Sequence, residues 1–271
     1  MTSIKHKLAD RCWASAWTGG TDCKGGITQE HIVSRSILKY FHYIETRNNG
    51  EIFKFGKKSF VMPILCEYHN RALSSSDAEA FKFFSGWYGM LFKKHNHHIP
   101  EINIEGRQIL DIDGHTLERW YAKTFFNFVL FRAKVMSPKL SLYGLSPHSI
   151  IPKLYQRESF QHPFGIYRLN KTNPSADNFF SFKPEFSEVT VIDKDGSNRQ
   201  HEIPTYFYTR CGGVDLVGFF NLTAFEDEFA LNSYLKPIQE SLEKEAEYRH
   251  VEYGTDFHEN NLNKKVKITW E

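Results

Sequence analysis

The chain has 271 residues, of which 41% are hydrophobic and 15% aromatic, so it can bury a core of one large or two modest domains and is not a disordered protein. Its formal net charge of +2 is too small to indicate a nucleic-acid partner by itself. No apolar run reaches the roughly 18 residues of a spanning helix, and the first residues lack the apolar segment of a signal peptide, so we expect a cytoplasmic protein with no membrane partner.

The first part of the chain predicts two strand segments and two helices. Residues 27–33 favour a short strand, and residues 34–45 favour a helix directly after it. Residues 50–66 are rich in β-prone side chains and predict a hairpin. Ser76 and Glu79 match a helix capping box, so a second helix should begin there. The segment from Cys66 to Asn70 would then lie at the turn between strand and helix.

The second part predicts one long helix followed by a sheet. Residues 115–135 carry aromatic side chains at helical spacing. Several short β-prone segments follow between residues 164 and 222, with turn signals between them, which favours antiparallel strands. A charged helix over 236–250 and a last strand over 265–271 close the chain. We therefore predict an α+β protein, with a first domain at 1–95 and a second at 96–271.

Three of the four cysteines lie in the first part. In a reducing compartment clustered cysteines favour metal binding over disulfides. Cys12, Cys23, Cys66 and His69 together offer three thiolates and one imidazole, a complete ligand set for structural zinc. The spacing of Cys66 and His69 is that of a zinc knuckle, whereas Cys12 and Cys23 are further apart than is usual. The alternative is that the cysteines are small buried residues with His69 at the surface.

A metal clamp of this kind would bring two distant segments together. Glu30 and His31 follow Cys23 closely, and Asn70 follows His69 directly. If one ion holds Cys23 and Cys66, Glu30 and His31 should face Asn70. The clamp would then be scaffolding, and these three polar residues would be the groups that it positions.

The order of these motifs, C12…C23-KGGITQ-E30-H31-IVSRSIL…ILC66-EY-H69-N70-RALSSSD77, resembles the HNH (ββα-metal) nuclease family. The resemblance covers residues 12 to 81 and is nearest to members in which the second knuckle cysteine is a histidine. It implies an N-terminal zinc-stabilised ββα-metal module, followed by helices and a mainly antiparallel β-sheet domain.

The resemblance also implies a role for each polar residue. His31 matches the general base, because a histidine takes up a proton near neutral pH. Glu30 and Asn70 match ligands of a catalytic Mg²⁺ or Mn²⁺ ion, which prefers oxygen donors. The alternative for His31 is a histidine satisfied at a strand end, with Glu30 as its surface partner. Asp77 could approach this metal or simply favour the start of a helix.

The sequence departs from the family pattern in three places, one of which is a hairpin between the two halves that is larger than in the minimal motif. Ser34 stands where the family usually has a proline, and the central asparagine that braces the loop has no certain counterpart. Asn48 or Asn49 lies at a suitable distance, but both also fit a turn. These departures leave room for a degenerate member without activity.

Other polar residues have simpler interpretations. Residues 35–58 hold six basic and two acidic side chains, so Arg35, Lys54, Lys57 and Lys58 are candidates for binding phosphate backbones, although such a strip is equally typical of a solvated surface. His95, His97 and His98 have poor spacing for metal ligands and fit a solvated helix end. Cys211 is isolated and fits a buried strand thiol.

Three functions are compatible with these observations. The first is a metal-dependent endonuclease that acts on DNA, with RNA as the alternative substrate, and that uses structural zinc and catalytic Mg²⁺ or Mn²⁺. The resemblance implies that such a nuclease could be an effector of restriction or anti-phage defence that is controlled by a protein partner; a homo-oligomer is the alternative assembly. The second is a non-catalytic, zinc-stabilised module that binds nucleic acid or protein. The third is a structural protein whose cysteines only fasten the N-terminal part to the sheet.

Overall fold

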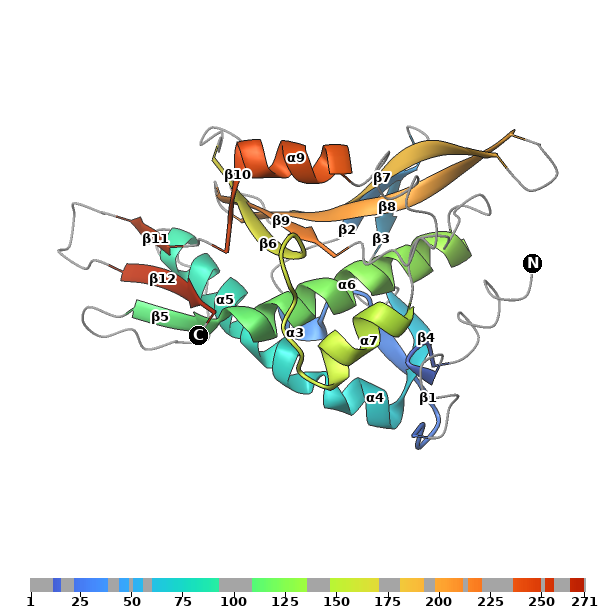
Figure 1. Ribbon diagram of the computed structural model, residues 1–271. Helices are drawn as coiled ribbons and strands as arrows, with labels where there is room; N and C mark the ends of the chain where they lie inside the picture. Colours follow the sequence, from blue (N-terminus) through green and yellow to red (C-terminus); the bar gives the residue numbers. More distant parts are fainter. Residues whose placement is uncertain are drawn as a thin grey trace.

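A computed structural model shows a mixed helix-and-sheet protein, which confirms the α+β class (Figure 1). The structure describes residues 12–15, 22–38, 44–48, 51–55, 60–92, 109–135, 147–170, 181–192, 198–211, 214–220, 236–249, 252–255 and 264–270.

A two-stranded antiparallel sheet followed by the helices α4 and α5 carries the predicted motifs of the N-terminal part. Strand β1 (Ile27–His31) pairs antiparallel with β4 (Val61–Cys66), with Glu30 opposite Met62. Helices α4 (Glu67–Ala72) and α5 (Ser74–Phe92) follow β4 directly. The segment from Cys66 to Asn70 therefore lies between strand and helix, as predicted.

The predicted hairpin over 50–66 is wrong in its pairing. Strand β3 (Glu51–Phe55) pairs with β2 (Ile44–Asn48), not with β4. The register places Asn48 opposite Glu51, with an Asn-Gly pair between them in the sequence. Asn-Gly is the strongest signal for a two-residue hairpin loop, and it outweighs the longer-range pairing that we expected.

Two predicted helix boundaries also need correction. Helix α3 (Arg35–Leu38) is short, and Ile44 and Glu45 belong to strand β2 instead of the helix expected over 34–45. Ser76 does not begin a helix, because α5 already starts at Ser74. Glu79, the expected partner in the capping box, instead accepts a hydrogen bond from the backbone N–H of Asp113 at 2.8 Å.

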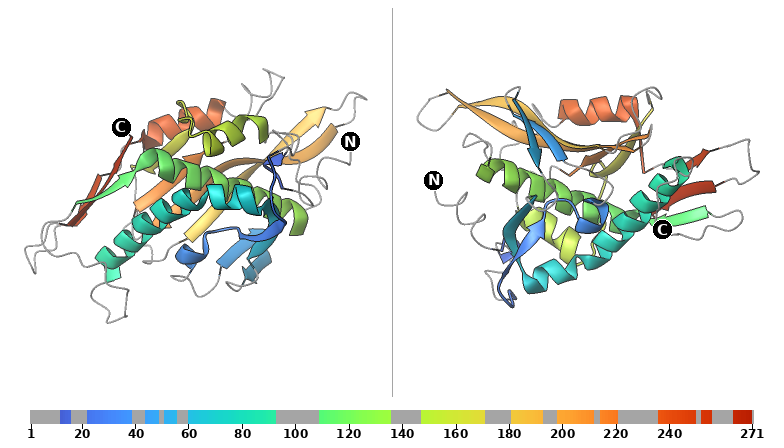
Figure 2. Two further views of the ribbon diagram at one scale, coloured as in Figure 1. Left: turned by 90° about the horizontal axis from the view of Figure 1, so that it is seen from below. Right: turned by 180° about the vertical axis from the view of Figure 1, so that it is seen from behind.

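Helix α6 (Gly114–Val135) passes through the middle of the protein, between the layer of α3, α4 and α5 and a five-stranded sheet (Figures 1 and 2). Its apolar face is buried as predicted. The ring of Trp120 packs against that of Phe84 in α5, with ring centroids 5.2 Å apart, and against that of Phe182 in the sheet, with ring centroids 5.9 Å apart. Helix α7 (Pro147–Tyr155), which we did not predict, packs beside α6.

The five-stranded sheet is antiparallel throughout, with the order β10-β6-β9-β8-β7. Its strands are β6 (Gly165–Leu169), β7 (Ser181–Ile192), β8 (Asn198–Cys211), β9 (Val214–Phe219) and β10 (Ala246–Tyr248). Helix α9 (Lys236–Glu245) covers the face opposite α6 (Figure 1). The helix predicted over 236–250 thus ends early, since its last residues form β10.

A smaller sheet has the order β11-β12-β5 and includes a pairing that we did not predict. Strand β5 (Ile109–Asp113) runs parallel to β12 (Lys264–Thr269), which in turn pairs antiparallel with β11 (Glu252–Thr255). The last predicted strand is therefore confirmed as β12.

One cluster of buried apolar side chains extends through both predicted parts of the chain, from Trp13 and Phe84 to Phe207 and Ile268. The sheet of β1 and β4 therefore packs on a core that the second part helps to build. The predicted boundary between residues 95 and 96 lies outside the described residues. Across the described residues, every helix is too short or too polar to span a bilayer.

Candidate metal centre and hydrolytic site

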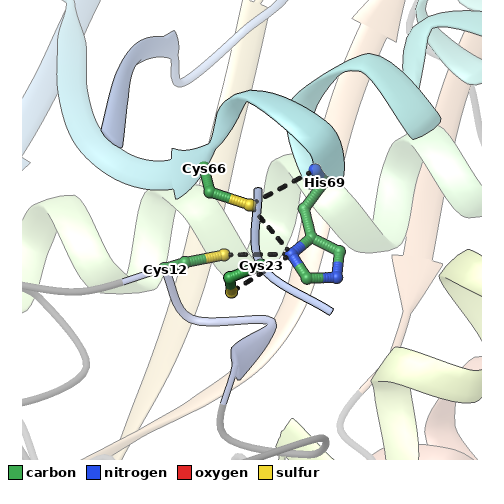
Figure 3. A group of neighbouring side chains, drawn as sticks. All are labelled: Cys12, Cys23, Cys66 and His69. Atoms are coloured by element: carbon green, nitrogen blue, oxygen red, sulfur yellow. Dashed lines mark hydrogen bonds between the residues drawn. The ribbon is translucent and has the colours of Figure 1, made fainter. Parts of the chain in front are cut away.

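Cys12, Cys23, Cys66 and His69 converge on one point, with all four ligand atoms within 4.8 Å of one another (Figure 3). The Nδ1 atom of His69 lies 3.3, 3.6 and 3.2 Å from the sulfurs of Cys12, Cys23 and Cys66. Tetrahedral zinc with ordinary bond lengths would separate a sulfur and a nitrogen ligand by about 3.6 Å. The cluster can therefore hold a metal ion such as zinc, and the predicted ligand set is confirmed as a spatial group.

The local backbone explains how two ligands come from one turn. Cys66 is the N-cap of α4, and its sulfur accepts a hydrogen bond from the backbone N–H of His69 at 3.5 Å. A residue at the N-cap faces the third residue of the helix. The Cys-x-x-His spacing thus directs both side chains to the same point.

Main-chain hydrogen bonds bring in the other two ligands. The backbone N–H groups of Glu67 and Tyr68, in the first turn of α4, donate to the carbonyls of Gly26 and Lys24. Gly25 between them has a φ of 73°, and a side chain there would meet Glu67 at 2.7 Å. These bonds place Cys23 at the start of α4. Cys12 is placed in the same way, because the N–H of Trp13 donates to the carbonyl of Ile64 at 2.9 Å.

The thiols are in an environment that suits a cation. Burial raises the pKa of Cys12, and burial followed by the charge of Cys12 raises the pKa of Cys23 to about 12. Burial also acts on Cys66, but hydrogen bonds from the backbone N–H groups of His69 and Lys24 lower its pKa to about 7. Several thiolates so close together repel one another, and a divalent cation removes that cost.

The Asp22 carboxylate contacts the His69 ring, which the sequence did not indicate. Its Oδ2 lies 3.1 Å from Nε2 of His69. A carboxylate there holds the proton on Nε2 and leaves Nδ1 free to bind a metal, as in many histidine–zinc sites. The only sequence signal was an acidic residue directly before Cys23.

Glu30 and Asn70 lie side by side, as the clamp predicts. The Asn70 side chain hydrogen-bonds the Glu30 carboxylate. Its Nδ2 also donates to Oγ1 of Thr28 at 3.1 Å, a contact between residues 42 positions apart, and Thr28 donates in turn to the carbonyl of Leu65. Asn70 is therefore fixed between β1 and β4, beside the metal cluster.

His31 ends β1 and is partly exposed. Burial lowers its pKa below the ordinary value of 6.5, and the positive charges of Arg35 and Lys123 lower it further, while Asp77 opposes them. The imidazole is therefore neutral at pH 7. A neutral imidazole can accept a proton, which is what a general base requires.

Lys123 is a member of this polar network that the sequence did not identify. It lies on α6, is fully buried, and places its Nζ 2.6 Å from Oε1 of Glu30 and 3.0 Å from both carboxylate oxygens of Asp77. Burial opposes its charge, but the Asp77 and Glu30 carboxylates outweigh burial and raise its pKa. The signal available in the sequence was a lysine one helical turn after Trp120, on the face of the helix that carries the aromatic side chains.

Ser34 and Trp120 complete this network. The Ser34 hydroxyl donates to Oδ1 of Asp77, and Nε1 of Trp120 donates to the Ser34 hydroxyl at 2.6 Å. Asp77 lies in the first turn of α5, where an acidic residue favours the start of a helix. Its carboxylate also forms an ion pair with Lys123, so the side chain has a second role in this network. Ser34, which replaces the proline of the family pattern, is a bonded member of the site.

The arrangement around Glu30 does not fit a catalytic magnesium ion. Oε1 of Glu30 already binds the Lys123 ammonium, and Asn70 directs N–H groups at Glu30 and Thr28. A divalent cation bound by Glu30 would lie beside a buried positive charge. Burial raises the pKa of Glu30, which also weakens it as an ionic ligand, although Lys123 opposes that shift.

The remaining predicted residues are only partly described. Arg35 is exposed on α3, close enough to His31 for its charge to act there. Lys54 lies in β3 and Asn48 in β2, but their side chains lie outside the described part, as does that of Cys211 in β8. The others lie wholly outside the described residues, namely Asn49, Lys57, Lys58, His95, His97 and His98.

Comparisons with protein families, with curated proteins and with solved structures find no match for this chain. The likeness to HNH nucleases therefore rests on the motif order and on the geometry of the Cys12, Cys23, Cys66 and His69 cluster.

Proposed function

We propose that this protein is an HNH-type endonuclease that hydrolyses phosphodiester bonds of nucleic acid, DNA in preference to RNA. The observation that carries the proposal is the contact between Glu30 and Asn70 beside the Cys₃His cluster. This is the juxtaposition that the resemblance requires, and it joins β1 to the start of α4. His31, next to Glu30, is the proposed general base.

The protein's own residues can perform the proton transfer and part of the substrate binding. Arg35, which is exposed at the start of α3 and four residues after His31, is positioned to bind a phosphate. Water attacks phosphorus and gives a proton to the neutral His31 imidazole as the new oxygen–phosphorus bond forms. The bond from phosphorus to the 3′ oxygen breaks, and the departing oxygen takes a proton from solvent.

The proposed metals have different support. Zinc has a complete ligand set in Cys12, Cys23, Cys66 and His69 and would act as scaffolding. Catalytic Mg²⁺ or Mn²⁺ remains an expectation of the resemblance alone. A role in restriction or anti-phage defence, with a regulatory protein or a second copy as partner, is proposed on the same ground.

A plasmid-nicking assay tests the proposal. Zinc-loaded protein is incubated with supercoiled DNA in Mg²⁺, in Mn²⁺ and without added divalent ion. Loss of a general base costs about 10²–10⁴-fold in rate, so His31→Ala should nick at least 100-fold more slowly with zinc content unchanged. His162→Ala is the matched control, because His162 is half exposed and contacts Glu243 of α9. Equal rates for the wild type and His31→Ala would refute the proposal.

The second candidate is a non-catalytic module that binds nucleic acid. The observation that favours it is the Lys123 ammonium on Glu30, which removes the carboxylate that the family uses for its metal. This candidate predicts that DNA is retarded in a gel but stays intact with every divalent ion. Arg35→Ala would then weaken the retardation, whereas His31→Ala would have little effect on it.

A further inference from the structure

We propose that the Lys123 ammonium takes the place of a divalent cation between Glu30 and Asp77, so that this carboxylate pair is closed to metal ions. The exclusion of metal follows from the geometry of three side chains. Its consequence for catalysis, hydrolysis that needs no divalent ion at this pair, rests on the proposed endonuclease function.

The two carboxylates provide an oxygen partner for every N–H donor of the Lys123 ammonium. A lysine ammonium has three N–H donors, and Nζ of Lys123 has three oxygen partners, at 2.6 Å on Glu30 and at 3.0 Å twice on Asp77. The partners come from β1 and α5, and the lysine comes from α6. In many metal sites a cation joins carboxylates from separate elements. Here the ammonium nitrogen of Lys123 has the position that a metal ion would have in such a site.

The same carboxylates are committed to other donors as well. Asn70 hydrogen-bonds Glu30, and the Ser34 hydroxyl donates to Asp77. Trp120 holds Ser34 in that orientation. A divalent ion would have to displace the ammonium and compete with these donors for the remaining lone pairs.

The lysine has little freedom to withdraw. Its side chain is 1% exposed, and Trp120 and Asn127, one turn away on either side along α6, are fully buried. Moving Nζ off the carboxylates would leave a charge inside the core with no partner, which is strongly unfavourable. Lys123 is therefore a positioning residue that fixes Glu30 and Asp77 beside His31.

Manganese binding to zinc-loaded protein tests the inference without reference to activity. Electron paramagnetic resonance of a Mn²⁺ titration should show no tight site in the wild type. Lys123→Ala should gain about one Mn²⁺ per chain, and Lys123→Ala combined with Asp77→Asn should lose it again. Lys82→Ala is the matched control, because Lys82 is an exposed lysine of α5 paired with Glu79, and it should gain none.

Thermal unfolding provides a second measurement. Mn²⁺ should raise the Tm of Lys123→Ala and leave that of the wild type unchanged. If Lys123→Ala does not fold, Lys123→Gln replaces it in both measurements. The Mn²⁺ titration of the wild type needs no variant, and a tight Mn²⁺ site at the carboxylate pair would contradict the inference. A tight Mn²⁺ site in the wild type that Glu30→Gln abolishes would overturn the inference, as would a folded Lys123→Ala protein that binds no Mn²⁺.

The two proposals can fail separately. A protein that cuts no nucleic acid but shows this Mn²⁺ pattern refutes the endonuclease and leaves the role of Lys123 intact. A protein that nicks DNA through His31 and binds Mn²⁺ at Glu30 in the wild type does the reverse.

Discussion

Replacing Lys123 by methionine should strongly destabilise the fold. Methionine keeps the length of the side chain and most of its apolar contacts but removes the ammonium. Glu30, which is 5% exposed, would then keep a buried negative charge with only the Asn70 amide beside it. Removal of one partner from a buried ion pair costs about 3–5 kcal/mol. Asp77 is 27% exposed and can be solvated in part, so we expect a value near the lower end, about 3 kcal/mol.

Urea denaturation of zinc-loaded protein measures this cost. The expected result is a lower midpoint for Lys123→Met with an unchanged slope, since the surface exposed on unfolding stays the same. Lys82→Met, the control, removes an exposed pair with Glu79 and should cost less than about 1 kcal/mol. Adding Glu30→Gln to Lys123→Met should restore part of the loss, because the two residues are directly coupled. A Lys123→Met protein within about 1 kcal/mol of the wild type would refute this account of the network.

Three further predictions concern the metal cluster and the proposed base. Elemental analysis should find less zinc in Cys12→Ser than in the wild type, and this variant should unfold at a lower temperature. The control His162→Ala should retain one zinc per chain. A full zinc content in Cys12→Ser would show that Cys12 is not a ligand. Asp22→Ala should weaken zinc binding about 10–100-fold in a chelator competition, because it removes the acceptor for Nε2 of His69; unchanged affinity would remove Asp22 from the site. The pKa of His31 is lowered, so its neutral form persists below pH 6.5, and the acid limb of the nicking rate should fall at a pH below that value. Arg35→Ala removes a positive charge that lowers this pKa, so the acid limb should move to higher pH; a limb that moves to lower pH would contradict the assignment.

The metal cluster could be predicted because its geometry is mostly local. Cys66 and His69 lie within one helical turn, and the glycines around Cys23 are compatible with a tight turn. The contact of Glu30 with Asn70 followed from that clamp. Asp22 could not be predicted, since an acidic residue next to a cysteine has no distinctive pattern.

The network around Lys123 depends on contacts that no local rule predicts. Lys123 and Asp77 are 46 residues apart, and Trp120 and Ser34 are 86 apart. Helical periodicity placed Trp120 on the buried face of α6 correctly. It could not say what a lysine on the same face would meet, because that depends on how α6 packs against β1 and α5.

The strand pairs also differ in how well they could be predicted, according to the distance between their strands in the sequence. The pairs β7–β8 and β8–β9 are neighbours in sequence and were expected as antiparallel strands. The parallel pair of β5 with β12 joins segments at residues 109–113 and 264–269, and sequence patterns carry little information about such distant partners. The pairing of β1 with β4 around a second hairpin, β2–β3, was missed for the same reason.

X-ray absorption at the zinc edge of the purified protein tests the central claim most directly. The Cys₃His cluster predicts one zinc per chain with three sulfur ligands at about 2.3 Å and one nitrogen at about 2.0 Å. Protein purified without chelator that contains no zinc, or zinc bound mainly by oxygen and nitrogen, would contradict the claim that this cluster holds Glu30 and Asn70 together.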